Sequence, residues 1–443
     1  MTASLRSFRT GLFEEHLAEA SFLYDQCLHM RQAVGKPWQR VAAFEERLEL
    51  HLDALVVGGT LALGVCQRRA QEGDAGEVFA AVSVFCRQEQ ASLLAGTLTA
   101  LDGSDPDKTQ AVADALKQEL PPHWTRFIEQ ALSREDERLL PMLAATCGHR
   151  RIPCEAALCA ALKRLPAPPL ALVEAVGKLR ANAAAGDLKR LLGHAQPALR
   201  AAALLALLRL GQTDALQAQY LPSHKESWPR LAMGLAGDAS ALHALAQPVA
   251  SGDVDADSLH AIGLLGIPGS LRYLYECLAD KKLAPAAARA LSWVCGADLQ
   301  EDAFTPEPVN EDELFPRELK AWREYKEAPR AADGKPFGST ERRLCLDPAV
   351  WKQWFAQHMP QFDPELRYRN GKLYSPGVLL DILIQPEGDT LLRRLAAQEL
   401  DIRCGCPVVF EVDMPVAHQW KALRSMAAWV KDRERSVQPG RWA

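Results

Sequence analysis

The sequence lacks any hydrophobic run that is long enough to cross a membrane. Its longest uncharged apolar stretch, residues 54 to 67, falls short of the roughly 20 residues that a membrane-spanning helix needs. The first residues also lack the apolar core of a secretory signal, and Glu14 and Glu15 come early. We therefore expect no membrane insertion, and a buried helix over residues 54 to 67.

A basic excess is absent as well. The 443 residues carry 51 Lys and Arg against 56 Asp and Glu, a net charge of -5, whereas nucleic-acid binders usually show a basic surplus or stripe. Cysteine is present, but its 11 copies are odd in number and irregularly spaced, so no disulfide framework is expected. These features predict a cytoplasmic protein that does not bind nucleic acid.

Known catalytic motifs are missing from the chain. There is no phosphate-binding GxxxxGK[ST] loop, no GxGxxG turn, no HExxH pair, and no kinase or serine-hydrolase signature. The 11 histidines are scattered, and no histidine precedes a glutamate, the dipeptide that some HEAT-repeat enzymes use to hold two iron ions. We therefore expect no catalytic residue, no cofactor and no metal site, and a protein that is not an enzyme.

What the sequence does contain is a recurring helix pair. Residues 188 to 211, LKRLLGHAQPALRAAALLALLRLG, are divided by Gly193 and Pro197 into two helices, the second ending at Gly211. Similar second helices end downstream at three glycines that step by 26, 29 and 30 residues, namely Gly237, Gly266 and Gly296. Upstream, helices are expected to end at Gly148 and Asn182. A helix pair recurring about every 30 residues is typical of an α-solenoid.

The pattern fits HEAT repeats best, because an arginine lies early in the second helix of two pairs, at Arg200 and Arg289. In stacked helix pairs such an arginine usually bonds a neighbouring carboxylate or the end of a helix. The predicted fold class is therefore all-α, a HEAT-like α-solenoid in which helix pairs form a right-handed superhelix. Stacking also explains helices that are apolar on almost every side, since neighbouring repeats cover them.

Composition divides the chain into five parts. We expect a helical N-terminal cap, the repeat array, an acidic-then-basic linker or insertion, a mainly helical C-terminal unit that could close the far end of the array, and a tail: residues 1–69, 70–297, 298–346, 347–432 and 433–443. The third part is rich in Pro, Gly and mixed charge, which predicts solvated disorder in this linker or insertion. A partner-binding segment is the alternative.

Several segments resemble one known family. They are FEEHLAEASFLYDQC and FEERLELHLDALVV near the start, AARALSWVCGADL at 287–299, and WKQWFAQHMPQFDPELRYRNGKLYSPGVLLDIL and LRRLAAQELDIRCG near the end. The family is a bacterial group with HEAT-like repeats and unknown biochemical function, often encoded with type VI secretion genes. The resemblance implies an association with the contractile secretion apparatus and carries over no catalytic residue. The stretch at about 300 to 345 is longer than this family usually has.

Three hypotheses for function follow. The first is a non-enzymatic scaffold that acts as adaptor or chaperone for a secreted effector, or for the spike or cap component that carries it. The second is an immunity protein that neutralises a secreted toxin, since acidic character complements a basic nuclease. An enzyme or nucleic-acid binder built on HEAT repeats is the third and least favoured.

For a protein-binding surface, we expect aromatic and arginine anchors, the residue types enriched at interface hot spots. The candidates lie in the later repeats and the C-terminal unit: Trp228, Tyr273, Tyr275, Trp293, Trp354, Tyr368 and Arg369. For each of them packing is favoured over contact with a partner, so the structure has to decide between these roles.

Overall fold

A computed structural model describes residues 3–32, 36–133, 137–220 and 226–441. Within these ranges the chain is mostly helical, with 23 α-helices and four short strands, so the predicted helical class is confirmed. No single helix in the described ranges is both long and apolar enough to cross a membrane; one pair bent by 116°, Trp38–Val57 with Gly59–Glu72, reaches the length only together.

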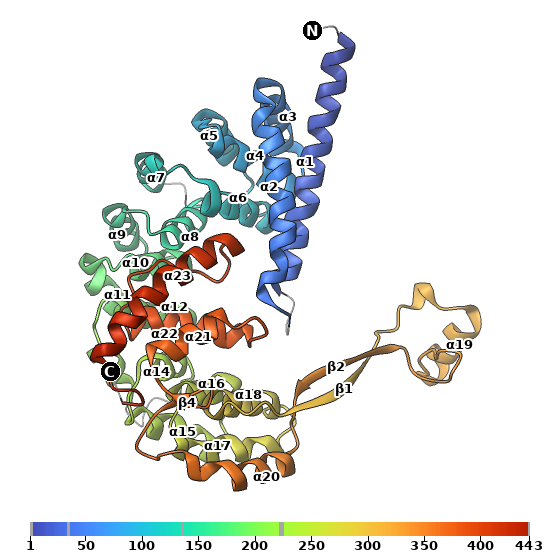
Figure 1. Cartoon of the computed structure of the whole chain (residues 1–443). Coiled ribbons are helices and arrows are strands. Elements are labelled where there is room, and N and C mark those ends of the chain that lie inside the picture. The colour runs from blue at the N-terminus through green and yellow to red at the C-terminus, as the bar shows by residue number, and fades with distance from the viewer. Residues whose placement is uncertain (1–2, 33–35, 134–136, 221–225, 442–443) are drawn as a thin grey trace.

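Eight helices form a curved row in which each packs on the next (Figure 1). They are α4 (Ala75–Arg87), α6 (Pro106–Glu119), α8 (Leu140–Arg150), α10 (Leu170–Lys178), α12 (Pro197–Arg209), α14 (Arg230–Ala236), α16 (Ala256–Leu265) and α18 (Ala284–Cys295). We call this set the central row. Seven further helices alternate with it along the chain: α5 (Ala91–Ala100), α7 (Thr125–Leu132), α9 (Glu155–Arg164), α11 (Ala185–Leu191), α13 (Asp214–Gln217), α15 (Ala241–Ser251) and α17 (Leu271–Glu276).

Helices at both ends of the chain complete the body. The first three are α1 (Ala3–Gln32), α2 (Ala42–Val57) and α3 (Gly59–Glu72), and they pack on α4. After the row come β1 (Gln300–Pro306), α19 (Pro316–Tyr325), β2 (Gly338–Leu344), α20 (Pro348–His358), β3 (Tyr368–Arg369), β4 (Lys372–Leu373), α21 (Pro376–Ile384), α22 (Thr390–Ile402) and α23 (Val416–Arg433). Short 3-10 turns join many of these elements: η1 (Trp38–Val41), η2 (Pro122–Trp124), η3 (Asn182–Ala184), η4 (Ala218–Tyr220), η5 (Pro268–Ser270), η6 (Cys277–Ala279), η7 (Glu311–Glu313), η8 (Met359–Gln361) and η9 (Glu434–Ser436).

Close contacts between small residues explain why the central row is rich in alanine and glycine. A Cβ atom added to the glycine would lie within 3 Å of the next helix at four junctions, which pair Gly148 with Ala175, Gly177 with Ala206, Gly234 with Ala261 and Gly263 with Ala290. Larger side chains at these positions would push neighbouring helices apart. The row therefore depends on small residues at each contact.

The predicted helix ends are partly right. Gly211, Gly266 and Gly296 have left-handed backbone angles just after α12, α16 and α18, as a glycine terminator requires. Gly237 also directly follows its helix, α14, although its backbone is extended there. The ends predicted at Gly148 and Asn182 are wrong. The helix containing Gly148 continues to Arg150, and the helix expected to end at Asn182 stops at Lys178. There, Arg151 and Arg180 take the left-handed conformation instead of a glycine or asparagine.

The C-terminal segment, residues 347–441, does more than close the far end of the row. It begins on α17, where the rings of Phe355 and Tyr275 lie 5.9 Å apart, and then returns along the carboxyl ends of the row towards α2. Figure 1 shows α21, α22 and α23 lying inside the curve. The segment has its own hydrophobic cluster, which Leu235, Leu264 and Trp293 of the row join.

Charged groups join this segment to the helix ends. At α16, the Arg369 guanidinium donates to the carbonyls of Gly263 and Leu264 at 2.9 and 2.6 Å, and Arg403 donates to the Leu235 carbonyl of α14 at 3.1 Å. These contacts satisfy carbonyls that a helix end leaves without partners, and they place positive charge where the helix dipole favours it. At α12 the arginine belongs to the row instead: Arg209 donates to Asp401 of the C-terminal segment at 2.6 Å.

Residues 300–344 form an arm with paired strands and a helix, which corrects the expectation of solvated disorder for this linker or insertion. Strands β1 and β2 pair antiparallel from Gln300 opposite Leu344 to Pro306 opposite Gly338, and α19 lies between them in the chain. The arm extends away from the body at the right of Figure 1. Its strands escaped prediction because their residues are mostly polar and none is buried, so they lack the alternating hydrophobic pattern of a half-buried strand.

Candidate protein-binding site

Three of the seven predicted anchors are buried, so their assignment to a protein-binding surface is wrong in this structure. Trp293 is 2% exposed, its indole donates to Asp389 at 3.0 Å, and its ring stacks on His260. Tyr368 and Arg369 are 7% and 0% exposed. All three hold the C-terminal segment against the central row. Their burial depends on contacts between parts of the chain that are far apart in sequence.

Three other predicted anchors lie together at the far end of the row. Tyr273 and Tyr275 are half-buried on α17, and Trp354 is half-buried on α20. Trp354 stacks on His358 with ring centres 4.4 Å apart, and Tyr273 lies under the Arg272 guanidinium at 4.6 Å. Among the three, Tyr275 joins α17 to α20 through Phe355, and all three side chains remain partly exposed.

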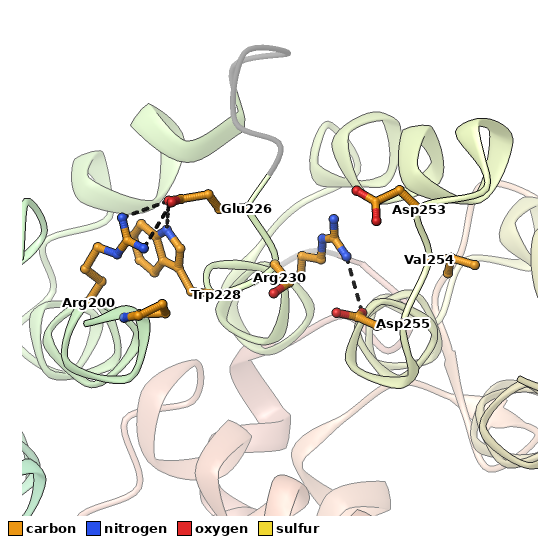
Figure 2. A pocket seen from close by; sticks show the side chains of 9 residues that line it. Arg200, Glu226, Trp228, Arg230, Asp253, Val254 and Asp255 are labelled. Atoms are coloured by element: carbon orange, nitrogen blue, oxygen red, sulfur yellow. Dashed lines mark hydrogen bonds and ion pairs between the residues drawn. The ribbon is translucent and has the colours of Figure 1, made fainter. Parts of the chain in front are cut away.

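The last predicted anchor, Trp228, lines a hollow of about 330 Å³ between the amino ends of α12, α14 and α16. Figure 2 shows its indole beside Arg200 and Glu226. The Arg200 guanidinium lies 5.3 Å from the ring centre and forms a 2.9 Å ion pair with Glu226, which also accepts from the indole N–H at 2.7 Å. The expectation that Arg200 bonds a neighbouring carboxylate is confirmed, as is the same expectation for Arg289, which pairs with Asp389 at 3.0 Å.

The opposite side of this hollow carries a second arginine and two acidic groups. Arg230 is 6% exposed, donates to the Ser258 hydroxyl at 2.7 Å and pairs with Asp255 at 3.3 Å. Burial raises the pKa of Asp255, but its hydrogen bonds with Ser258 and the Arg230 charge outweigh burial, so the pKa lies below its ordinary value. Together with Asp253, the lining presents one indole, two paired arginines and three carboxylates. The arginines offset two of these three carboxylates, and the Arg200 guanidinium already lies over the Trp228 ring.

The arm is the second candidate surface, and none of its residues from 300 to 344 is buried. Two aromatic side chains near its helix are largely exposed, Phe315 at 74% and Tyr325 at 72%, and Phe304 and Phe337 are nearly half exposed. Its backbone pairing is accompanied by exposed ion pairs: Arg343 pairs with Glu301 across the strands at 2.8 Å, and Arg323 pairs with Glu311 at 2.8 Å. The arm is thus a formed projection with an aromatic tip and no core.

Sequence reasoning missed these aromatic residues because it treated residues 298–346 as a linker. The signal that could have found them was the presence of Phe315, Trp322 and Tyr325 in a stretch otherwise typical of disorder, which is usually poor in aromatic residues. In the part of the chain that the structure describes, no group of three or more His, Cys, Asp or Glu side chains is arranged to hold a metal ion.

Comparison with known protein families, with curated proteins and with solved structures finds no match for this chain. The function is therefore argued from the surfaces described above.

Proposed function

We propose that the chain is a HEAT-like α-solenoid, a right-handed superhelix of helix pairs, that acts as a non-enzymatic protein-binding scaffold. The alternation of central and outer helices supports the repeat class, because each outer helix packs on a helix of the row next to it in sequence. Solenoids of this kind offer long surfaces for partners without specialised chemistry. The fold by itself does not define a function, so the proposal depends on a particular surface.

The proposal rests on the arm, residues 300–344, none of which is buried against the body. A two-stranded hairpin and a helix of 10 residues are each only marginally stable alone, because neither buries an apolar face. The arm nevertheless presents Phe315 and Tyr325 to solvent at its tip. Large exposed aromatic residues on a projecting element are expected where a partner covers them, and such residues anchor protein interfaces.

For the partner, we propose a secreted effector, or a spike or cap component of a type VI secretion system, which the chain would serve as a cytoplasmic adaptor or chaperone. This choice rests on the family resemblance of the end segments. The arm is longer than the stretch that this family usually has, so we propose that the arm determines which partner this chain binds. The alternative remains an immunity protein, in which the arm or the hollow around Trp228 would cover a toxin.

The test is affinity purification of the tagged full chain from its own bacterium, with mass spectrometry of the proteins that co-elute. The double variant Phe315→Ser with Tyr325→Ser should lose its specific partner. A control variant, Val57→Ser, changes a side chain that is 87% exposed on the body and should retain the partner. Equal recovery by both variants would remove the arm from the proposal.

The identity of the recovered protein separates adaptor from immunity function. Spike or cap proteins together with an effector support the adaptor, and a gene deletion should then abolish killing of competitors. Recovery of a single toxin, inactive in the complex, supports immunity, and deletion should then harm the producing strain. If the unaltered chain recovers no specific protein partner, that result would contradict both the adaptor and the immunity function.

A further inference from the structure

Three carboxylates of the C-terminal segment each connect two neighbouring helices of the central row. They lie in residues 401–413, the end of α22 and the loop that follows it, which we call the strap. Asp413 lies 3.7 Å from the Lys117 amine of α6 and 3.1 Å from the His149 ring of α8. One acidic side chain therefore contacts basic groups on both sides of the junction between α6 and α8.

The other two carboxylates repeat this arrangement at the next two junctions. Glu411 is 2.8 Å from both Arg151 and Lys178, at the ends of α8 and α10. Asp401 is 3.0 Å from an arginine just after α10 and 2.6 Å from another at the end of α12, namely Arg180 and Arg209. The strap thus runs back along the row from α12 to α6 and connects four helices in succession.

The basic groups lie in or just after the last turns of their helices, where the helix dipole favours positive charge. The dipole explains basic residues at helix ends, but it does not explain why a carboxylate of a distant segment meets two of them at each junction. Of these five lysines and arginines, only Lys117 has a further carboxylate partner within the described chain, Asp114 at 3.0 Å. Without the strap, the ends of these helices would present a row of like charges.

The strap is anchored to its own segment by apolar contacts. Cys404, Cys406 and Phe410 lie in the hydrophobic cluster of the C-terminal segment. The buried residues of the row in that cluster belong to α14, α16 and α18, and α22 packs on α12 and α14. The far half of the row therefore contacts the segment through apolar side chains, whereas the strap reaches α6, α8 and α10 through ion pairs.

We propose that the strap sets the curvature of the central row between α6 and α12 by charge. Each carboxylate attracts the ends of two neighbouring helices and draws them together, while the basic groups alone would repel one another. Asp401, Glu411 and Asp413 are 24%, 19% and 49% exposed, so dissolved salt can screen these attractions. The strap shares no residue with the arm, and its role does not rest on the proposed function.

The experiment measures the distance between two spin labels on the full chain by double electron–electron resonance. The labels replace His123 and Thr213, exposed residues that follow α6 and α12. They are attached through keto amino acids, so that the native cysteines are not labelled. Raising the salt from about 0.05 M to about 1 M should lengthen this distance in the unaltered strap, because salt screens the attraction that draws the helix ends together.

Neutralising the three carboxylates, with Asp401→Asn, Glu411→Gln and Asp413→Asn, should lengthen the distance at low salt by about 2 Å or more, the size of ordinary helix shifts. The response to salt should then change sign. Salt should shorten the distance, because only repulsion between the basic groups is left to screen. Adding Arg151→Gln and Lys178→Gln to this variant should restore a shorter distance.

The matched control changes the net charge by the same amount but leaves the strap intact. It neutralises three carboxylates that pair outside the strap, with Glu301→Gln, Glu311→Gln and Asp381→Asn, and should keep the distance and the salt response of the unaltered chain.

Circular dichroism shows whether each variant folds. If the triple variant does not fold, Glu411→Gln alone should give a smaller change in the same direction. A distance that neither salt nor these substitutions alter would overturn the proposal. A salt response of the same sign with and without the strap carboxylates would overturn it too.

Discussion

The arm and the joint between the C-terminal segment and the central row each contain an arginine–glutamate ion pair of the same length, but the two pairs differ in burial. Arg369 and Glu399 are 2.8 Å apart with both side chains fully buried, whereas Arg343 and Glu301 are 2.8 Å apart with side chains 56% and 29% exposed. Water screens the exposed pair, so it contributes little, while either member of the buried pair would be costly without the other. Distance alone therefore does not tell which contacts hold the molecule together.

The largest effect is expected at the buried pair. Glu399→Gln should lower the free energy of unfolding by about 3–5 kcal/mol, because Arg369 would keep its charge in a buried site without a counter-charge. Urea unfolding followed by circular dichroism measures the change. The matched control is Glu301→Gln in the arm, which should cost at most about 1 kcal/mol. Similar losses for the two variants would contradict the comparison.

The tight contacts of the central row should give the next largest effect. Gly263→Ala places a Cβ 2.9 Å from the Cβ of Ala290, which should destabilise the chain by about 1–3 kcal/mol through overpacking. Gly186→Ala on α11 adds the same methyl group where no atom lies within 4 Å. There the better helix propensity of alanine should stabilise by up to about 1 kcal/mol. Thermal unfolding should show opposite signs, and equal signs would refute the packing argument.

A smaller effect should appear as a pH dependence at the same joint. Burial, and then the Arg289 charge, lower the pKa of His260, and these effects outweigh attraction to Asp257 and Asp389. The folded chain therefore resists protonation at His260, while the unfolded chain takes up the proton at the ordinary histidine pKa. This contribution to stability is present above about pH 6.5 and is lost as the pH falls towards the lower folded pKa.

The variant His260→Gln should reduce the decline in unfolding free energy between pH 7 and pH 5, by at most about 1.4 kcal/mol per pH unit. Urea unfolding at several pH values measures that slope. His123→Gln, in a histidine whose side chain is 60% exposed, should keep the slope of the unaltered chain. An unchanged slope in His260→Gln would show that other groups cause the acid sensitivity.

The smallest effect on stability is expected in the arm. Phe315→Ser removes a side chain that is 74% exposed, so the unfolding free energy of the isolated chain should change by no more than about 0.5 kcal/mol. The same change should nevertheless reduce partner recovery in the purification described above. A loss of stability comparable to that of Glu399→Gln would mean that the arm packs on the body.

How far the sequence predicts the structure depends on how local each feature is. Gly211, Gly266 and Gly296 were found because a left-handed helix terminator is a property of one residue and its neighbours. The arm was missed because β1 pairs with β2 across more than 30 intervening residues, and the residues of both strands are mostly polar. Of the predicted anchors, Trp228 lines a hollow, whereas Trp293 and Arg369 were misjudged because distant segments cover them.

By itself, the sequence determined the helical class and three of the left-handed glycines that end its helices. Local backbone preference and the spacing of apolar residues are sufficient for these features. Only the tertiary structure decided that the C-terminal segment returns along the carboxyl ends of the row, which side chains it buries, and that residues 300–344 project as an arm. Burial depends on which distant segments meet, so an arginine–glutamate pair is fully enclosed at the joint, whereas a pair of the same type and length in the arm stays exposed to water.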